Sequence, residues 1–486
     1  MTKLTINNSM CSIIGLPKEA EKRLRHELSY PSQAVSYSYH KNLRQIEYIN
    51  QRLDDKKLNV DRNALISERT RLERINHSLK RKLFVMLYKD GEFPTGLLPR
   101  VLEVLNDCQI QHEVDDQRRK PIKLQHKFVL KKSFPNMRYY QRTSARLAAE
   151  AGRGIIVAAT GTGKTLTMLK MIWEMGLKCL IITPNKGITD NAVDSLIEYF
   201  GKSAVTRLNT KSKKTGIINV ANIQALIKID PKVLEDINAV YIDEFHHSAA
   251  ETYQEVNQKH LKNCYYRIGL TATNFRNDGS DLALEGVLSE VLYEYTIPQA
   301  IKDGFLVAPD FEMVNTSCDA ENNYQTEYKK GIVENEERNA IIAEIAKHHE
   351  KDSVLILVQQ VEHGESLKKL MPDAAFLHGE EKDDVRKRVM EDFRKKRIRS
   401  IIGTSVIGEG IDLPIANVLI MGGGGKAKSQ IMQNIGRVMR LFPGKDWAKV
   451  YDFTDEDSHH LSRHSEIRQQ IYQEEYVVEI SKEEEE

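Results

Sequence analysis

The stretch AATGTGKT at residues 158–165 is the part of the sequence that decides the fold class. It lies between a short apolar run at 154–158 and a segment with helical spacing that stops at Gly176. Its glycines, Gly161 and Gly163, allow backbone N–H groups to curl around phosphate oxygens, and the N-terminus of the following helix adds positive charge. A strand, a glycine-rich loop and a helix in this order predict a phosphate-binding loop in an α/β sheet.

From about residue 134 onward, short apolar runs rich in β-branched residues alternate with longer helical segments. The first series of predicted strands is 154–158, 178–182, 217–220, 239–242 and 265–270. After a pause, a second series follows at 354–358, 374–377, 400–403, 417–421 and 450–453. Such alternation is typical of doubly wound parallel sheets with helices on both faces. The sequence therefore predicts an α/β protein with two tandem sheet domains at 131–307 and 308–470, with their boundary near 306–309.

The first 130 residues have a different pattern and predict a small α+β domain. Two strand-like segments, 33–40 and 82–89, are followed by a turn at Asp90-Gly91 and a helix from about Gly96 to Asn106. The segment 41–82 lacks proline and glycine and predicts an inserted helical hairpin that turns near 54–59. It carries about twice as many Lys and Arg as Asp and Glu. DNA contact is one interpretation of this charge, and a solvated or protein-binding face is the other.

Composition limits the class of protein. A chain of 486 residues is long enough for several hydrophobic cores, and its net charge of +2 leaves only local charge as a sign of nucleic-acid binding. The five cysteines form no Cys-x-x-Cys pair, which disfavours a disulfide framework and a zinc module. No apolar run approaches the ~20 residues of a membrane span. We expect a cytoplasmic protein with no membrane partner. The chain is expected to end in an acidic tail at 471–486, of which the last six residues, SKEEEE, are disordered.

A second element supplies carboxylates to the predicted phosphate site. The run AVYIDEFH at 239–246 contains Asp243 and Glu244 at the end of a predicted buried strand. Because the carboxyl ends of parallel strands meet at one edge of a sheet, both are expected beside the phosphate loop. Lys164 would reach the β- and γ-phosphates of ATP, while Thr165 and Asp243 would hold Mg²⁺ and Glu244 would polarise the attacking water. The loop residues expected to contact the nucleotide are Thr160, Gly161, Thr162, Gly163, Lys164 and Thr165.

The run QNIGRVMR at 433–440 belongs to the second predicted sheet domain. On a helix, Arg437 and Arg440 are three residues apart and share a face. Two arginines delivered from another domain would stabilise the transferring phosphate only when the domains close. We therefore predict catalytic roles for Gln433, Arg437 and Arg440, against the alternative of two solvated helix arginines.

These elements, in this order, resemble the superfamily-two helicases over about 134–453, and further motifs strengthen the likeness. They are RYYQ at 138–141, TPN at 183–185, NIQAL at 222–226, LTAT at 270–273 and GTSVIGEGID at 403–412. The resemblance implies two tandem RecA-like domains, a nucleotide site that includes Arg138, Gln141, Gly410 and Asp412, and nucleic-acid contacts at Pro184, Asn185, Gln224 and Thr404. It also implies that Thr271, Thr273 and His246 couple hydrolysis to strand movement.

Within that superfamily, LTATNFRNDG at 270–279 and DGFLVAP at 303–309 are similar to the branch of repair helicases and restriction translocases. The N-terminal module followed by this motor resembles phage UvsW-type branch-migration helicases, with the insertion at 41–82 as a departure. The likeness implies an ATP-dependent DNA helicase or translocase that acts as a monomer on single-stranded, forked or junction DNA. It would work in replication, recombination or repair, with partner proteins of those processes, in the host cytoplasm if a phage encodes it. The alternatives are an RNA helicase, or an ATP-gated clamp or translocase subunit of a restriction or repair complex.

Overall fold

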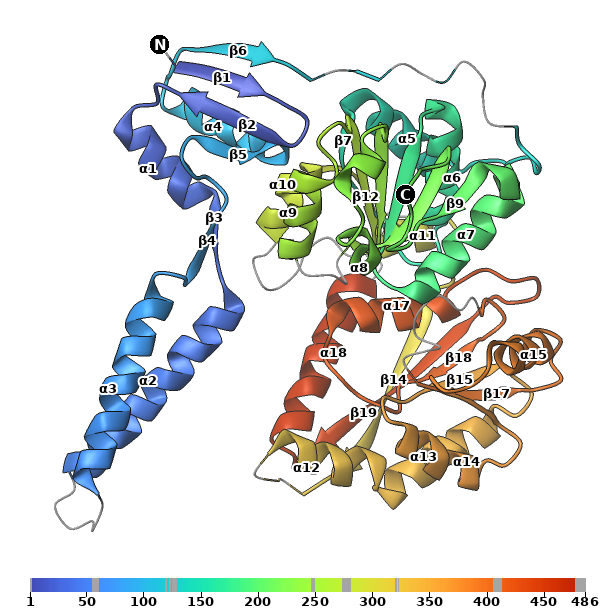
Figure 1. Ribbon diagram of the computed structural model, residues 1–486. Helices are drawn as coiled ribbons and strands as arrows, with labels where there is room; N and C mark the ends of the chain where they lie inside the picture. Colours follow the sequence, from blue (N-terminus) through green and yellow to red (C-terminus); the bar gives the residue numbers. More distant parts are fainter. Residues whose placement is uncertain are drawn as a thin grey trace, which may run out of the picture.

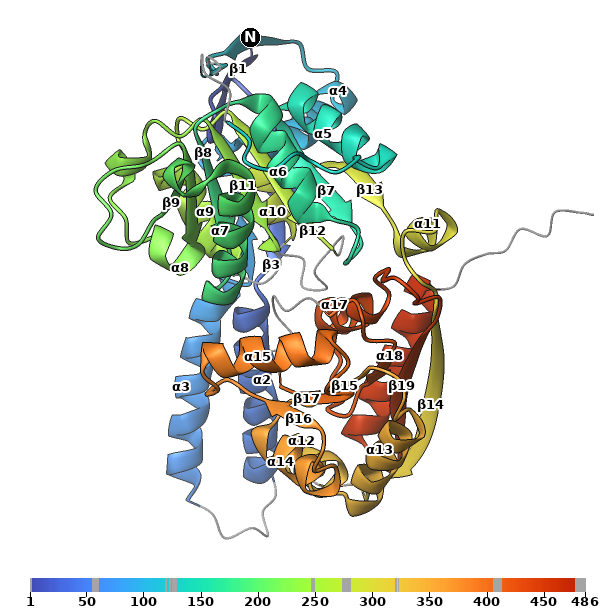
Figure 2. The same ribbon diagram turned by 90° about the vertical axis from the view of Figure 1, so that its right-hand side faces the viewer.

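The computed structural model describes residues 2–54, 61–118, 120–121, 124, 129–245, 250–272, 281–319, 321, 323–404 and 413–476. It shows two parallel-sheet α/β domains, one above the other in Figures 1 and 2, and an N-terminal α+β module beside the upper one in Figure 1. Four residues with predicted roles, His246, Thr273, Gly410 and Asp412, lie outside the described residues. Within the described part of the chain, no helix has both the length and the apolarity needed to cross a membrane.

The first sheet has seven parallel strands in the order β13-β7-β12-β11-β8-β10-β9. The strands are β7 (Arg153–Ala158), β8 (Cys179–Thr183), β9 (Val205–Arg207), β10 (Ile218–Asn222), β11 (Ala239–Asp243), β12 (Tyr266–Thr271) and β13 (Val291–Tyr295). One face is covered by α5 (Tyr139–Ala151), α6 (Lys164–Met175) and α7 (Lys186–Phe200), and the other by α8 (Ile223–Leu226), α9 (Ala250–Lys259) and α10 (Asp281–Leu288). All five predicted strands are confirmed, and β9 and β13 are additions.

The second sheet has six parallel strands in the order β14-β19-β18-β15-β17-β16. They are β14 (Pro309–Ser317), β15 (Val354–Leu357), β16 (Ala375–Leu377), β17 (Ser400–Gly403), β18 (Val418–Ile420) and β19 (Ala448–Glu456). Its helices include α12 (Tyr324–Tyr328), α13 (Glu336–His348), α14 (Val361–Leu370), α15 (Asp383–Arg394), α17 (Lys428–Val438) and α18 (His460–Tyr476). The five predicted strands of this series are confirmed, and the two-domain fold class is correct.

The predicted start of the acidic tail at residue 471 is wrong. Helix α18 continues to Tyr476 and packs against β14, where the ring of Tyr472 stacks on that of Phe311. Burial of Ile471, Tyr472 and Tyr476 stabilises this last part of the helix. Because charged residues surround Ile471, Tyr472 and Tyr476 in the sequence, the helical spacing of these three residues was not recognised.

The N-terminal module is a four-stranded sheet, in the order β5-β2-β1-β6, packed on two helices. Its elements are β1 (Thr2–Ile6), β2 (Met10–Ile14), α1 (Lys18–Glu27), β5 (Glu92–Pro94), a 3₁₀ turn at Thr95–Leu97, α4 (Leu98–Asp107) and β6 (His112–Asp116). The predicted turn at Asp90-Gly91 is confirmed, with φ values of 52° and 82°. The predicted helix at 96–106 is confirmed as the 3₁₀ turn followed by α4.

The inserted helical hairpin begins earlier than predicted. Helix α2 (Gln33–Asp54) occupies the segment 33–40 that was expected to be a strand, and α3 (Arg62–Lys80) returns beside it. The side chain of Asn76 joins the two helices, since it donates to the Tyr39 carbonyl and accepts from the Asn42 amide. A short antiparallel pair, β3 (Ser29–Pro31) and β4 (Phe84–Met86), joins it to the module, so the strand expected at 82–89 is present only in part. The predicted turn of the hairpin lies outside the described residues, except at Asp54.

The N-terminal module is fixed to the first sheet domain by buried polar contacts. The Arg267 guanidinium, fully buried, donates to the Ser9 hydroxyl at 2.7 Å and to the Leu261 carbonyl at 2.6 Å. At the edge of the same interface, Arg100 forms a bidentate ion pair with Glu285. Its Nε donates to Oε1 at 2.5 Å and its Nη2 donates to Oε2 at 2.8 Å. Such charge-assisted contacts hold one orientation, so the module and the first domain form one body.

Gly96 lies at the centre of this interface. A Cβ atom there would meet the carbonyl oxygens of Glu285 and Gly286, which are backbone atoms and cannot rotate away. Replacing Gly96 by alanine should therefore lower the free energy of unfolding by about 1–3 kcal/mol. Urea denaturation followed by circular dichroism measures this loss, and an unchanged midpoint would mean that the module is not held against α10.

Candidate nucleotide site

The phosphate loop connects β7 to α6 at the carboxyl edge of the first sheet. Gly161 and Gly163 have φ values of 89° and 88°, which a side chain would disfavour, and the loop curls so that Thr162 N–H donates to the Ala159 carbonyl at 3.2 Å. The Thr162 hydroxyl donates to the same carbonyl at 2.6 Å. The N-terminus of α6 points its N–H groups into the space above this curl, which is an arrangement that attracts anions.

Lys164, the first residue of α6, extends across the mouth of the loop. Its Nζ donates to the Ala158 carbonyl at 3.1 Å and lies 3.3 Å from Oε1 of Glu244. The Glu244 backbone has a φ of 46°, an uncommon value for a non-glycine residue, and its N–H donates to the Leu270 carbonyl at 2.9 Å. Strained backbone of this kind is concentrated at functional sites. The structure thus brings Lys164 and Glu244 together, as the sequence predicted.

Asp243 ends β11 and is buried next to Lys164 and Glu244. Burial raises the pKa of Asp243 above the usual range, and the neighbouring Glu244 carboxylate raises it further, while Lys164 opposes the shift. A bound cation would offset both effects because it stabilises the ionised carboxylate. The Asp243 and Glu244 carboxylates and the Thr165 hydroxyl are hard oxygen donors, which Mg²⁺ prefers.

The donor set also fits the phosphates of a nucleotide. The Thr160 hydroxyl is buried in the loop and has no hydrogen-bond partner among the described residues. A phosphate oxygen in the loop could accept from it, which would satisfy a group that otherwise costs free energy to bury. Thr165, in the first turn of α6, is exposed beside it and available to a cation.

Gln141 and Arg138, the predicted nucleotide-contacting pair, pack directly against the loop. The Gln141 amide donates to the Thr162 carbonyl at 3.1 Å and accepts from the Arg138 N–H at 3.0 Å. The Arg138 guanidinium lies 4.2 Å from the centre of the Phe305 ring, in the connection between the sheet domains. Tyr140 also bonds to the Thr162 carbonyl, and its ring stacks on Tyr295 at 3.8 Å. This pairing of Tyr140 with Tyr295 was not predicted.

The second sheet domain reaches the loop through α17. Gly436 faces Thr160 so closely that an added Cβ would come within 2.5 Å of the Thr160 Cβ. Beside it, the Val307 N–H donates to the Met439 carbonyl at 2.8 Å. One hydrophobic cluster continues from Ala158 and Ala159 into the helices of the second domain. The nucleotide site is therefore closed on one side by the second domain.

Arg437 and Arg440 do not share a helix, which corrects the prediction. Helix α17 ends at Val438, and Arg440 follows in an isolated β-bridge with Leu306. The helix stops because the chain turns to pair with the connection between the domains. Arg437 is buried on α17, Gln433 is half-buried one turn before it, and the Arg440 side chain passes next to Gly161. The Arg440 side chain therefore lies beside the phosphate loop.

The predicted strand-contacting residues, and the predicted coupling residue Thr271, lie at the carboxyl edges of the sheets. Pro184 and Asn185 follow β8, and the Asn185 side chain caps α7 by accepting from the Ile188 N–H at 2.9 Å. Gln224 is exposed on α8, directly after β10, and Thr271 is fully buried at the end of β12. The structure thus brings them to the edge that also carries the phosphate loop.

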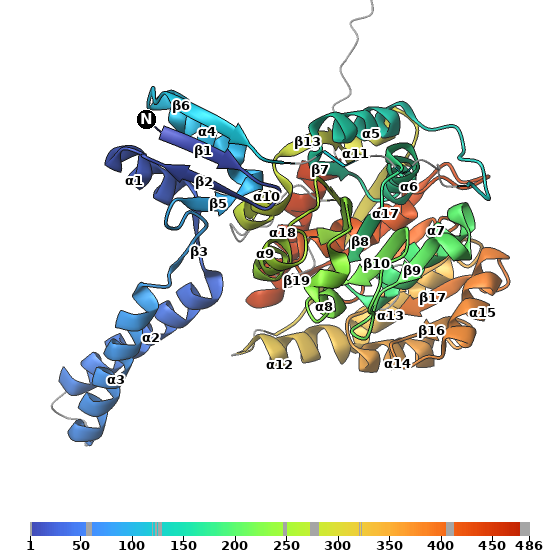
Figure 3. The same cartoon turned by 45° about the horizontal axis from the view of Figure 1, so that its top comes forward.

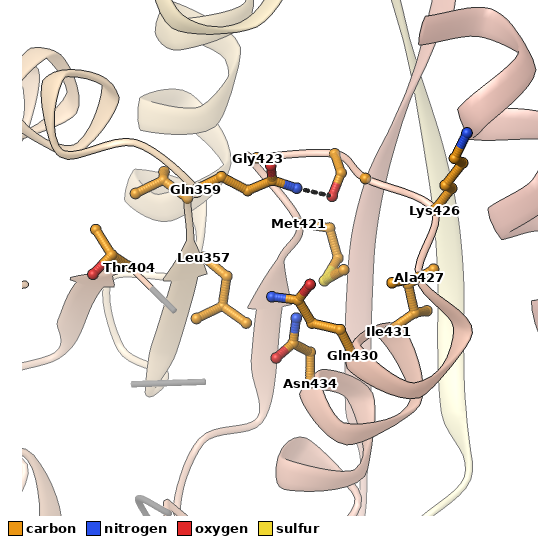
Figure 4. Close-up of a pocket in the computed structure, with 13 residues that line it drawn as sticks. Leu357, Gln359, Thr404, Met421, Gly423, Lys426, Ala427, Gln430, Ile431 and Asn434 are labelled. Carbon is orange, nitrogen blue, oxygen red and sulfur yellow. Dashed lines mark hydrogen bonds between the residues drawn. The ribbon is translucent and has the colours of Figure 1, made fainter. Parts of the chain in front are cut away.

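Thr404 follows β17 and lines a pocket at the carboxyl edge of the second sheet (Figure 4). Its neighbours there include Gln430 and Asn434 from α17 and the glycine-rich turn after β18, where the Gln359 amide donates to the Gly424 carbonyl at 3.2 Å. Asn434 is more than nine-tenths buried. The sequence analysis did not single out Asn434, because roles in the motif at 433–440 were assigned only to Gln433, Arg437 and Arg440.

Comparisons with known proteins agree with this architecture. Residues 134–276 match the family "Type III restriction enzyme, res subunit" and residues 319–442 match "Helicase conserved C-terminal domain". The relative irc3 of Schizosaccharomyces pombe, named as an ATP-dependent helicase, is 29% identical over 335 residues, 63% of this chain and 54% of that protein. The ATP-dependent DNA helicase uvsW of Enterobacteria phage T4 is 23% identical over 346 residues, 65% of this chain and 68% of that protein. The chain spans about half the length of irc3.

A solved structure supports the fold. A fragment named as an HsdR subunit of a type I restriction enzyme from Vibrio vulnificus YJ016 aligns with a TM-score of 0.52 at 20% identity, over 66% of this chain and 64% of that one. The two family matches fall on the first and second parallel sheets in order, and together they cover more than half of the chain. The chain therefore belongs to the superfamily-two helicases, which are ATP-dependent and built from two RecA-like domains.

Proposed function

We propose that this chain is a DNA-dependent ATPase that moves along DNA and remodels forked and four-way-junction DNA. The observation that carries the proposal is the seating of Gly436 on Thr160, which makes one nucleotide site from both RecA-like domains. Because the site is shared, hydrolysis and release of nucleotide must change the contact between the domains. If both domains contact the same nucleic-acid strand, their relative movement shifts the protein along that strand.

Each residue of the site has a proposed part in hydrolysis. Lys164 and the loop N–H groups hold the phosphates, and Glu244 orients and polarises the attacking water. Arg440, with Arg437 and Gln433 behind it, supplies positive charge from the second domain. Thr165 and Asp243 would hold Mg²⁺, which when bound neutralises charge on the phosphates. The strained backbone at Glu244 fixes its carboxylate near Lys164, so the base is positioned before the water arrives.

DNA is the proposed nucleic acid, for two reasons. The N-terminal module forms one body with the first RecA-like domain, so it can hold one arm of a branched molecule at a fixed distance from the motor. The relative uvsW, which is named as a DNA helicase, matches two thirds of its own length to this chain. Backbone contacts by residues such as Asn185, Gln224 and Thr404 would bind a strand without reading its sequence.

The test of this proposal is the ATPase rate of the full chain with five nucleic acids at one fixed salt concentration. They are single-stranded DNA, blunt duplex, a synthetic fork, a four-way junction and structured RNA. We expect the strongest stimulation by the fork and the junction and little by RNA. Stimulation mainly by RNA would replace the proposal with an RNA helicase, and no stimulation by any of them would contradict a nucleic-acid motor.

The contact between the domains can be tested at Gly436. Replacing Gly436 by alanine places a methyl group against Thr160, so the domains must separate by a few tenths of an ångström or more. We expect the stimulated ATPase rate to fall roughly tenfold, since a small misplacement of catalytic groups has large effects on rate. Gly187 on α7 is the matched control, because a Cβ there meets nothing closer than 3.6 Å. Equal rates for the two alanine variants would contradict a site shared between the domains.

A further inference from the structure

Helix α2 of the hairpin carries a continuous stripe of aromatic and basic side chains. Tyr37, Lys41, Arg44 and Tyr48 follow one another at spacings of four, three and four residues, which places them on one face of the helix. All four are exposed, and the tyrosines unusually so, at 73% for Tyr37 and 56% for Tyr48. Figures 1 and 3 show the hairpin projecting away from the two RecA-like domains.

The opposite side of α2 is used for folding. Ile49 is buried against α3, and Asn42 bonds to Asn76 across the hairpin. Since these residues hold the helices together, the stripe is not needed for packing. Both tyrosine rings leave apolar surface in water, and the Arg52 guanidinium lies 5.6 Å from the centre of the Tyr48 ring. Exposed tyrosines flanked by basic groups have the composition of a surface that binds single-stranded nucleic acid.

Carboxylates of the hairpin are kept off the stripe. Glu68 accepts a hydrogen bond from Gln45, Glu73 pairs with Arg69 on α3, and Asp61 caps the start of α3. Glu47 lies beside the stripe and not on it. At about 100° per residue, its side chain is rotated around the helix axis by about 60° from Arg44 and about 100° from Tyr48. The stripe itself therefore presents two positive charges and no negative one.

We propose that this stripe binds a single-stranded segment of the DNA that the motor acts on, an inference that rests on the proposed function. Tyrosine rings stack on bases of any sequence, and basic groups between them contact phosphates. From Tyr37 to Tyr48 the stripe is about 16 Å long, given a rise of 1.5 Å per residue, which is enough for a few nucleotides. A duplex would offer phosphates to Lys41 and Arg44 but no base faces to the tyrosines, so it fits the stripe less well.

The test measures equilibrium binding of the full chain, by fluorescence anisotropy, to a fork with two single-stranded arms and to a blunt duplex. The variant Tyr37→Ala with Tyr48→Ala should bind the fork roughly tenfold more weakly or worse, with the same dependence on salt. The variant Lys41→Gln with Arg44→Gln should lower the slope of log K against log salt by about 1.4, at about 0.7 per phosphate of a single strand. The tyrosine double variant should bind the blunt duplex as the wild type does, because a duplex offers no base faces to the rings.

Two matched controls separate stacking and charge from general effects. Tyr37→Phe with Tyr48→Phe keeps the rings and should bind the fork like the wild type. Lys347→Gln with Lys351→Gln removes the same charge from exposed residues in and just after α13, and should also change nothing. Wild-type binding of the fork by both the alanine and the glutamine double variants, or equal losses on fork and duplex for the alanine double variant, would overturn the role of the stripe while leaving the motor intact. A wild-type chain that binds no DNA would overturn the proposed function and this inference together.

Discussion

Replacing Glu244 by glutamine is expected to lower ATP turnover by roughly 10²–10⁴-fold while ATP binding persists. Glutamine has the same shape but cannot accept the proton of the attacking water. In the structure, Glu244 is the carboxylate that follows β11, within 3.3 Å of Lys164 and beside the phosphate loop. The measurement is steady-state ATPase with fork DNA, together with binding of a fluorescent ATP analogue.

The control for this variant is Glu290→Gln, an exposed glutamate just before β13 in the same domain. It removes the same charge at a distance from the loop and should leave turnover unchanged. If the Glu244 variant hydrolysed ATP at the wild-type rate, another residue would have to activate the water, and the assignment of the site would be wrong. If it lost ATP binding as well, Glu244 would have a structural part instead.

Replacing Lys164 by alanine is expected to lower turnover by roughly 10²–10³-fold or more and to weaken ATP binding, with DNA binding largely retained. The ammonium group is the single positive side chain of the loop, and in the structure it bridges the Ala158 carbonyl and Glu244. Without it, the phosphates would meet two carboxylates with no lysine between them. ATPase assays and DNA binding by anisotropy measure the two effects separately.

Lys170→Ala is the matched control, because Lys170 is on the same helix and its partner Glu174, at 3.1 Å, is on the outer surface. It should hydrolyse ATP normally. Persistent turnover in the Lys164 variant would contradict the nucleotide site. Equal loss of DNA binding would indicate that the variant had unfolded, which circular dichroism would reveal.

The core of the fold could be predicted because parallel strands covered on both faces are apolar without interruption. Strands such as β8 and β11 are buried at every position, which makes them visible in the sequence. The strand β14 at the edge of the second sheet has half-exposed, alternating residues and was missed. The hairpin helix α2 was mistaken for a strand, because Val35, Tyr37 and Tyr39 alternate with serines and imitate a period of two.

Some features of the candidate nucleotide site could likewise be predicted from the sequence, and others could not. Lys164 and Glu244 could be placed together from sequence, since the ends of parallel strands share one edge. The position of Arg440 beyond the end of α17 could not, because it depends on pairing with Leu306 across the domains. The stacking of Tyr140 on Tyr295 depends on two segments more than 150 residues apart and left no local signal.

In the proposed function, ATP hydrolysis at this shared site drives movement of DNA strands. The most direct measurement follows a labelled synthetic fork and a labelled four-way junction on a native gel, with ATP or a non-hydrolysable analogue, for the wild type and for Glu244→Gln. We expect conversion to separated or branch-migrated products only for the wild type with ATP. Hydrolysis without any change in the DNA, or conversion that also occurs with the analogue, would contradict the proposed function.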